Sequence, residues 1–118
     1  MPGFEHFGKE EIKEVNDVLE TGILMRYGFD GPRKGIWKAK ELEAAICETF
    51  GCKHAQLLSS GTAALTTAMS ALGIGYGDEI ILPSFTFVAS FEAVISVGAI
   101  PVFVDVDDTL TLNPTAVR

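Results

Sequence analysis

Residues 79–106, EIILPSFTFVASFEAVISVGAIPVFVDV, contain the pattern that decides the fold. The apolar run at 79–83 predicts a strand, residues 88–97 predict a helix, and residues 100–106 predict a second strand. Strands that alternate with helices pair in parallel through right-handed crossovers. Both runs are continuously apolar, which is typical of strands covered on both faces. The stretch therefore predicts an α/β layered fold with a mostly parallel sheet.

The same alternation begins earlier in the chain. HAQLL at 54–58 predicts another strand, and a helix is expected from about Thr62 to Leu72. Before these, apolar side chains recur at helical spacing in residues 9–20 and 38–50. The stripe of the second helix consists of Leu42, Ala45, Ile46 and Phe50. The residues between these helices, 22–37, predict irregular chain that is too apolar for a plain linker.

Charge and hydropathy exclude several classes of function. The net charge is −7 and the acidic residues are spread along the chain, so we expect no nucleic-acid partner. The pair Arg33-Lys34 is interpreted as solvated surface charge. No apolar run approaches the length of a membrane span, and the N-terminus lacks the features of a signal peptide. We therefore expect a cytoplasmic protein with no membrane partner.

The two cysteines predict neither a disulfide framework nor a metal site. Cys47, Cys52 and His54 have a spacing that superficially resembles a set of metal ligands. Structural zinc uses four ligands, and no fourth ligand is evident. Cys47 also falls on the apolar stripe of its helix.

The C-terminal residues indicate a helix that is started and then abandoned. Asn113-Pro114 is a favourable N-cap followed by proline at the first helical position, and residues 115–118 supply barely one turn. We expect a truncated chain with an incomplete sheet. The alternative is a frayed C-terminal tail.

The turn after the 54–58 run has the properties of an anion-binding site. Ser59, Ser60, Gly61 and Thr62 lead into a helix whose first N–H groups lack internal partners. Glycine permits close approach of a ligand, hydroxyl groups add donors, and phosphate suits such a helix start. The alternative, which the stretch alone leaves equally open, is that Ser59 or Ser60 only caps the helix. The turn matches neither a Walker loop nor a dinucleotide fingerprint.

The loop after the 79–83 run carries aromatic side chains. Phe85 and Phe87 are placed to cover a flat ring beside a phosphate pocket, because the carboxyl ends of parallel strands share one rim. For either residue alone, core packing is the simpler interpretation. Asp105 and Asp107 near the end of the 100–106 run are best explained as the polar rim of a buried strand.

Three segments together carry a family resemblance: SSGTAAL (59–65), GIGYGDEIILPSFTFVAS (73–90) and GAIPVFVDVD (98–107). They resemble the DegT/DnrJ/EryC1/StrS family of sugar aminotransferases, which use pyridoxal 5′-phosphate and have the aspartate-aminotransferase fold. The resemblance covers the N-terminal part of a family member, that is, part of the large domain of a fold-type-I enzyme. The segment TGILMRYGFD and Trp37 are most similar to the branch that aminates the eight-carbon sugar Kdo.

The resemblance implies roles for particular residues. Ser60, Gly61, Thr62 and Ala63 match the turn that holds the cofactor phosphate, and Phe87 matches the aromatic residue stacked on the pyridine ring. Arg26 and Tyr27 lie in the arm that approaches the active site, where an arginine can bind a substrate carboxylate. The alternative for Arg26 is a surface charge. These roles divide the chain into an N-terminal helix and substrate arm, 1–36, and an incomplete cofactor-binding domain, 37–118.

The resemblance also implies an activity and a departure from it. Family members transfer an amino group, in our expectation from glutamate, to a keto sugar, and they form dimers. Their Schiff-base lysine and pyridine-facing acid lie downstream of Arg118, and no lysine of this chain occupies the matching position. We expect a homo-oligomer that is catalytically silent alone. The alternatives are a non-catalytic binding or self-association module and a dehydratase of the same family.

Overall fold

The computed structural model describes residues 3–117, which divide into two compact units. The first unit ends at Leu57 and the second begins at Leu58. The two units are defined by packing alone. The boundary that we expect after residue 36 separates proposed functions instead, so it stays a prediction. Arg118, the last residue of the expected C-terminal helix turn, lies outside the described residues.

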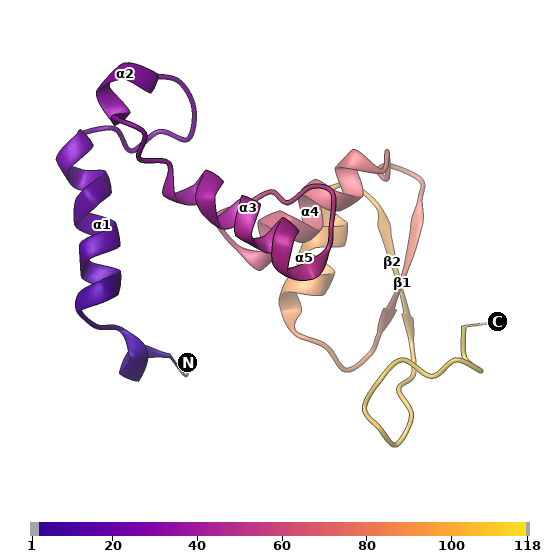
Figure 1. Ribbon diagram of the computed structural model, residues 1–118. Helices are drawn as coiled ribbons and strands as arrows, with labels where there is room; N and C mark the ends of the chain where they lie inside the picture. Colours follow the sequence, from indigo (N-terminus) through magenta and orange to yellow (C-terminus); the bar gives the residue numbers. More distant parts are fainter. Residues whose placement is uncertain (1–2, 118) are drawn as a thin grey trace. The chain divides into compact units, whose positions relative to one another are not determined.

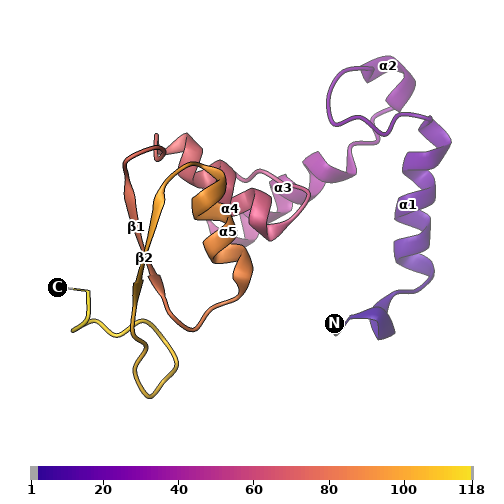
Figure 2. The same ribbon diagram turned by 180° about the vertical axis from the view of Figure 1, so that it is seen from behind.

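The second unit is built on a β–α–β crossover (Figures 1 and 2). Strands β1 (Glu79–Pro83) and β2 (Ile100–Val104) pair in parallel, with Glu79 opposite Ile100 and Pro83 opposite Val104. Helix α5 (Val88–Ser96) connects them and packs against both strands and against α4 (Gly61–Ala71). The predicted helices and the parallel pairing are confirmed, and the strand expected to end at Val106 ends two residues earlier.

The core of this unit lies between α5 and the two strands. Val94 is 1% exposed and Ala93 is fully buried. Around Leu82, Val94 and Ala99 pack the partly buried side chains of Met69, Ile74, Ile80, Phe91 and Val97. The turn after α5 favours glycine, because Gly98 has φ +82°, in the left-handed region that side chains with a Cβ rarely adopt. These contacts fix the crossover that carries the loop after β1.

Residues 54–58 do not form the strand that the sequence predicts. The N–H of Leu57 donates to the carboxylate of Glu43 over 2.7 Å, and its carbonyl accepts from the Gln56 side chain over 3.0 Å. A strand exists only when its backbone hydrogen-bonds to that of a neighbouring strand. The backbone groups of Leu57 bond to side chains instead, so they are not paired with another strand. Within residues 3–117 the sheet therefore consists of β1 and β2.

The first unit contains the short 3₁₀ helix η1 (Phe4–His6) and the helices α1 (Lys9–Thr21), α2 (Asp30–Arg33) and α3 (Lys38–Phe50). The helices predicted at residues 9–20 and 38–50 are confirmed as α1 and α3. Helix α2 lies within the stretch that was expected to be irregular throughout. Left-handed backbone at Phe29 and Lys34 begins and ends it, which explains why helical periodicity does not reveal it.

The buried face of α3 differs from the predicted stripe. Leu42 and Phe50 are 50% and 77% exposed, whereas Glu43, Ile46 and Cys47 are half-buried. Ile46 and Cys47 lie three and four residues after Glu43, so all three share one side of the helix. The segment 52–57 bonds to this side through Leu57 and Cys52. The covered face thus includes a carboxylate that hydropathy alone would assign to solvent.

Arg33 is buried rather than solvated, which corrects the expectation for this residue. It is 5% exposed, its guanidinium carbon lies 4.1 Å from the centre of the Trp37 ring, and its Nε donates to the Gly28 carbonyl over 2.9 Å. Stacking on an aromatic face and a bond to a carbonyl suit guanidinium well. Arg33 therefore holds the loop around α2 together.

No helix of the described residues combines the length and apolar character needed to cross a bilayer.

Candidate functional site

The turn at Ser60 forms the start of helix α4. Ser60 has extended backbone, and its side-chain oxygen accepts the N–H of Ala63 over 3.1 Å. Its carbonyl accepts the N–H of Ala64 over 3.0 Å. Ser60 is thus an N-cap, one of the two interpretations that the sequence left open. A serine hydroxyl that accepts one bond can still donate its hydrogen.

Two backbone donors remain at this helix start. Among residues 3–117, the N–H groups of Gly61 and Thr62 take part in no hydrogen bond. A Cβ added to Gly61 would meet no atom within 4 Å, so the space beside the backbone is open. The N–H of Ala63, which the resemblance places in the phosphate-binding turn, donates its hydrogen bond to the Ser60 side-chain oxygen. The residues present fit a phosphate group, with Gly61 and Thr62 as the backbone donors.

Phe87 lies where α5 begins, and its side chain is 78% exposed. Helix α5 starts at the end of the unit where β1 finishes, and α4 ends close to where β1 begins (Figure 1). Since α4 runs against the direction of β1, its first turn is directed toward the same rim as the β1–α5 loop. Phe85, on that loop, is 64% exposed. Core packing of these rings is therefore excluded within the second unit, and both remain free to cover a flat ligand.

The acidic residues after β2 hold a turn. The carboxylate of Asp107 accepts both the N–H and the hydroxyl of Thr109, over 2.9 Å and 2.5 Å. These two bonds, the hydroxyl bond above all, hold the pKa of Asp107 below its ordinary value. Val106 and Leu112 form a β-bridge that closes the loop. The interpretation of this segment as a polar rim agrees with these contacts.

In the first unit, Arg26 is held by a carboxylate. Its Nη2 lies 2.6 Å and 2.7 Å from the two carboxylate oxygens of Glu43, and 3.3 Å from the side-chain oxygen of Gln56. The Arg26 side chain is still 43% exposed, while that of Glu43 is 12% exposed. Arg26 is therefore neither a free surface charge nor fully engaged. Tyr27, the other residue of the predicted arm, is 73% exposed.

Glu43 is the partner of Arg26 that the sequence analysis missed. The bond from Arg26, and after it the Leu57 N–H, holds the pKa of this carboxyl below its ordinary value, so it carries its charge at neutral pH. A signal was present in the sequence, because Glu43 stands three residues before Ile46 and so borders the apolar stripe of its helix. An acid at that position needs a cationic partner.

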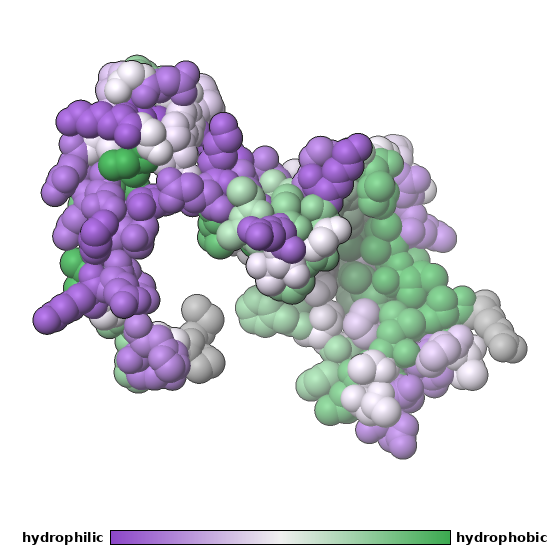
Figure 3. Space-filling view, in the orientation of Figure 1, coloured by the Kyte–Doolittle hydropathy of each residue, from purple (hydrophilic) through white to green (hydrophobic). Residues whose placement is uncertain are grey.

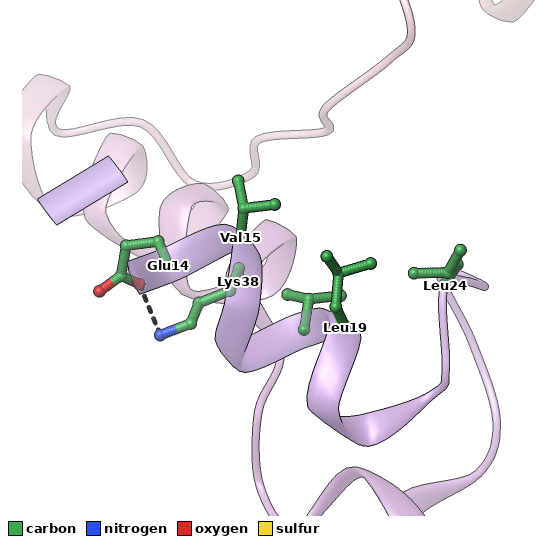
Figure 4. Close-up of a pocket in the computed structure, with 6 residues that line it drawn as sticks. Glu14, Val15, Leu19, Leu24 and Lys38 are labelled. Atoms are coloured by element: carbon green, nitrogen blue, oxygen red, sulfur yellow. Dashed lines mark ion pairs between the residues drawn. The ribbon is translucent and has the colours of Figure 1, made fainter. Parts of the chain in front are cut away.

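A separate apolar cavity of about 300 Å³ lies in the first unit, between α1 and the residues after it (Figure 4). Apolar side chains of α1 and Leu24 line it, and Lys38 pairs with Glu14 at its rim. Neither Arg26 nor Tyr27 is among the residues that line this cavity. None of the residues predicted to bind cofactor or substrate contributes to it.

The profile of the DegT/DnrJ/EryC1/StrS aminotransferase family matches residues 5–118. The chain belongs to this family. The matched range includes both Arg26 and the turn at Ser60. Pyridoxal 5′-phosphate is the cofactor of the family's aminotransferases, which confirms the cofactor that the resemblance implies.

Solved structures of family members agree with this assignment. A putative sugar aminotransferase from Streptococcus pneumoniae, Spr1654, is 34% identical with a TM-score of 0.80, and the match covers 94% of this chain and 26% of that one. The 3-amino-5-hydroxybenzoic acid synthase is 35% identical with a TM-score of 0.81, covering 94% and 27%. GDP-4-keto-6-deoxymannose-3-dehydratase is 26% identical with a TM-score of 0.73, covering 91% and 27%. The chain spans about a quarter of the length of these structures.

Proposed function

We propose that this chain forms part of a pyridoxal-phosphate-dependent aminotransferase that acts on a keto sugar. The observation that carries the proposal is the helix start at Ser60–Thr62, which keeps two backbone donors free in a chain of this family. The similarity to a putative sugar aminotransferase at 34% identity supports the substrate class. Glutamate is the amino donor that we propose.

The residues of the second unit have distinct roles in this proposal. Gly61 and Thr62 donate their N–H groups to the cofactor phosphate, and the hydroxyls of Ser60 and Thr62 add further donors. The N–H of Ala63 keeps Ser60 in position by bonding to its oxygen. Phe87 covers one face of the cofactor ring. When bound, the cofactor supplies an electron-accepting ring that stabilises negative charge on the substrate carbon that loses a proton.

The arm in residues 1–36 is proposed to bind the sugar. Arg26 gives only Nη2 to Glu43, so its Nε and Nη1 groups remain available to a substrate carboxylate. The exposed hydroxyl of Tyr27 adds a donor or an acceptor. A sugar acid of the Kdo type has both the keto group and the carboxylate that this pair requires. Residues 37–118 then form the cofactor-binding part.

A family dehydratase is the second candidate, because the 3-dehydratase of GDP-4-keto-6-deoxymannose is 26% identical to this chain. Such an enzyme removes water from the sugar, whereas an aminotransferase leaves an amino group on it. The third candidate, a homo-oligomer or a non-catalytic self-association module, is supported by exposed apolar surface. Figure 3 shows a largely hydrophobic surface where β1 and β2 lie. Ile81 and Ile100, which the register places on the same face of the strand pair, are 43% and 50% exposed.

Titration of this chain tests the phosphate site directly. We expect pyridoxal 5′-phosphate to bind more tightly than pyridoxal, and inorganic phosphate to compete. Gly61→Ala places a methyl group in the open space and should weaken binding of the phosphate about tenfold, or about 1.4 kcal/mol. Gly31→Ala is the matched control, because Gly31 is also helical and an added Cβ there also meets nothing within 4 Å. Equal affinity for pyridoxal, or an unaffected Gly61→Ala variant, contradicts the proposed site.

The covalent step is tested separately. All six lysines precede residue 58, and none matches the position of the Schiff-base lysine, so borohydride reduction with the cofactor should leave no specific pyridoxyl-lysine in this chain. The longest product of the gene is then assayed for 2-oxoglutarate formation from glutamate and a keto sugar. A single stoichiometric adduct together with transaminase activity in the 118-residue chain contradicts the silent-chain proposal.

A further inference from the structure

The two cysteines of the chain meet at the C-terminal end of α3. Cys47 lies in the last turn of the helix, and Cys52 follows directly after Gly51. Gly51 has φ +63° and ψ +24°, so the helix ends there in left-handed backbone and the chain turns back. As a result, the sulfur of Cys52 lies 4.0 Å from the Ile46 carbonyl oxygen, over the last turn.

This kind of helix ending brings particular side chains together. When a left-handed glycine ends a helix, the residue after it contacts the residue four positions before the glycine. Here those residues are Cys52 and Cys47, and both are free thiols. The Cys52 sulfur lies over the same last helical turn that carries Cys47. A disulfide requires such proximity, with Cα atoms roughly 4.4–6.8 Å apart.

The environments of the two thiols differ. Cys47 is half-buried, and its pKa is raised first by this burial, then by the neighbouring Cys52 thiol and by the negative charge of Glu43. Cys52 is exposed. An oxidant from solvent therefore reaches Cys52 first, and Cys47 is the neighbour that reacts with the oxidised sulfur.

We propose that Cys47 and Cys52 form a redox-modification site at which a peroxide produces a reversible intramolecular disulfide. The Cys52 thiolate attacks a peroxide oxygen, the O–O bond breaks, and a sulfenic acid and one molecule of water or alcohol result. The Cys47 thiolate then attacks the Cys52 sulfur, the S–O bond breaks, and the leaving hydroxide takes up a proton as water. Two thiols lose two electrons and two protons in total, and the peroxide accepts them. A dithiol reductant reverses the change.

The disulfide would tie the segment after Gly51 to α3. Residues 52–57 continue to the Leu57 N–H that Glu43 holds, so a bond at Cys52 restrains this segment at both ends. The inference concerns the first unit alone and does not depend on cofactor binding.

Mass spectrometry of the whole chain tests the inference. The protein is treated with hydrogen peroxide at low molar excess, quenched with iodoacetamide, and digested without reduction. Trypsin releases residues 41–53, ELEAAICETFGCK, which contain both cysteines. We expect this peptide to lose two hydrogens and to escape alkylation. Cleavage after Glu48 should yield two pieces that stay linked until dithiothreitol separates them.

Two matched variants assign the order of the steps. Cys47→Ser should retain a sulfenic acid at Cys52 that dimedone traps, whereas Cys52→Ser should form little adduct at Cys47. The inference is overturned when the wild-type chain accumulates sulfenic or sulfinic acid without the linked peptide. It is also overturned when non-reducing gels show that the disulfide forms only between chains.

Discussion

Arg26 and Glu43 are joined by an ion pair in which one arginine nitrogen, Nη2, lies 2.6 Å and 2.7 Å from the two carboxylate oxygens. The same carboxylate accepts the N–H of Leu57 over 2.7 Å. Glu43 thus connects three separate parts of the first unit: the arm, helix α3 and the segment that leads to Leu57. Because the carboxylate is 12% exposed, the interaction is shielded from solvent more than a surface pair is.

Glu43→Gln retains the shape of the side chain and removes its charge. We expect a lower unfolding temperature and a faster exchange of the Leu57 amide, because the amide accepts weaker hydrogen bonds than the carboxylate. Glu48→Gln on the same helix, at an exposed position, is the control and should leave both unchanged. Unfolding is followed by circular dichroism, and exchange by NMR. Equal behaviour of the two variants contradicts the role of Glu43.

The ion pair also predicts a pH dependence. The pKa of Glu43 in the folded chain lies below its ordinary value of 4.5, chiefly because of Arg26. The pair therefore stabilises the fold when the pH is above the ordinary pKa of 4.5. This contribution disappears as the pH falls through the lower pKa of the folded chain. Urea unfolding between about pH 6 and about pH 3 should show the wild type losing its advantage over Glu43→Gln. A constant difference between the two proteins across this range would exclude the effect.

Ser60→Ala removes the cap of α4. Loss of an N-cap side chain costs about 1 kcal/mol, so the free energy of unfolding should fall by that amount. Ser59→Ala is the control, because within residues 3–117 the Ser59 side chain forms no hydrogen bond, and its effect should be about 0.5 kcal/mol or less. Chemical denaturation measures both. If Ser59→Ala is the more harmful change, the assignment of the cap is wrong.

Phe87→Ala separates binding from stability. The ring is 78% exposed, so its removal should change the free energy of unfolding little. Stacking on an aromatic ligand contributes about 1 kcal/mol, so the affinity for pyridoxal 5′-phosphate should fall about fivefold. Phe85→Ala, which removes a ring that is 64% exposed on the same loop, should have a smaller effect. Calorimetric titration gives both affinities, and the reverse order argues against Phe87 as the stacking residue.

Local patterns were sufficient for most of the second unit. The strand at 79–83 and the helices near residues 61 and 88 were predicted within one or two residues, because continuous apolar runs, glycines and a serine cap are local signals. Residues 54–58 have the same apolar texture and form no strand. Apolar character specifies that a segment is covered, and only the hydrogen-bonded neighbour makes it a strand.

The candidate site residues of the two units were predictable to different degrees. The turn at Ser60–Thr62 depends on consecutive residues, and the sequence located it with its alternative as a cap. Arg26 meets Glu43 over a separation of 17 residues, and local spacing contains no information about such a contact. The burial of Arg33 on Trp37 was missed for a related reason, since left-handed backbone at Phe29 and Lys34 interrupts the helical periodicity.

The sequence by itself determined the fold class, the family, the cofactor and the helix start that suits a phosphate. Each of these depends on residues that are close in the chain or on a run of matched segments. Only the tertiary structure decided which polar groups pair with which: Arg26 with Glu43, Arg33 with Trp37, and Cys52 with the last turn of α3. Pairing depends on how the chain returns on itself, and the positive φ angles at Gly51, Phe29 and Lys34 set that return.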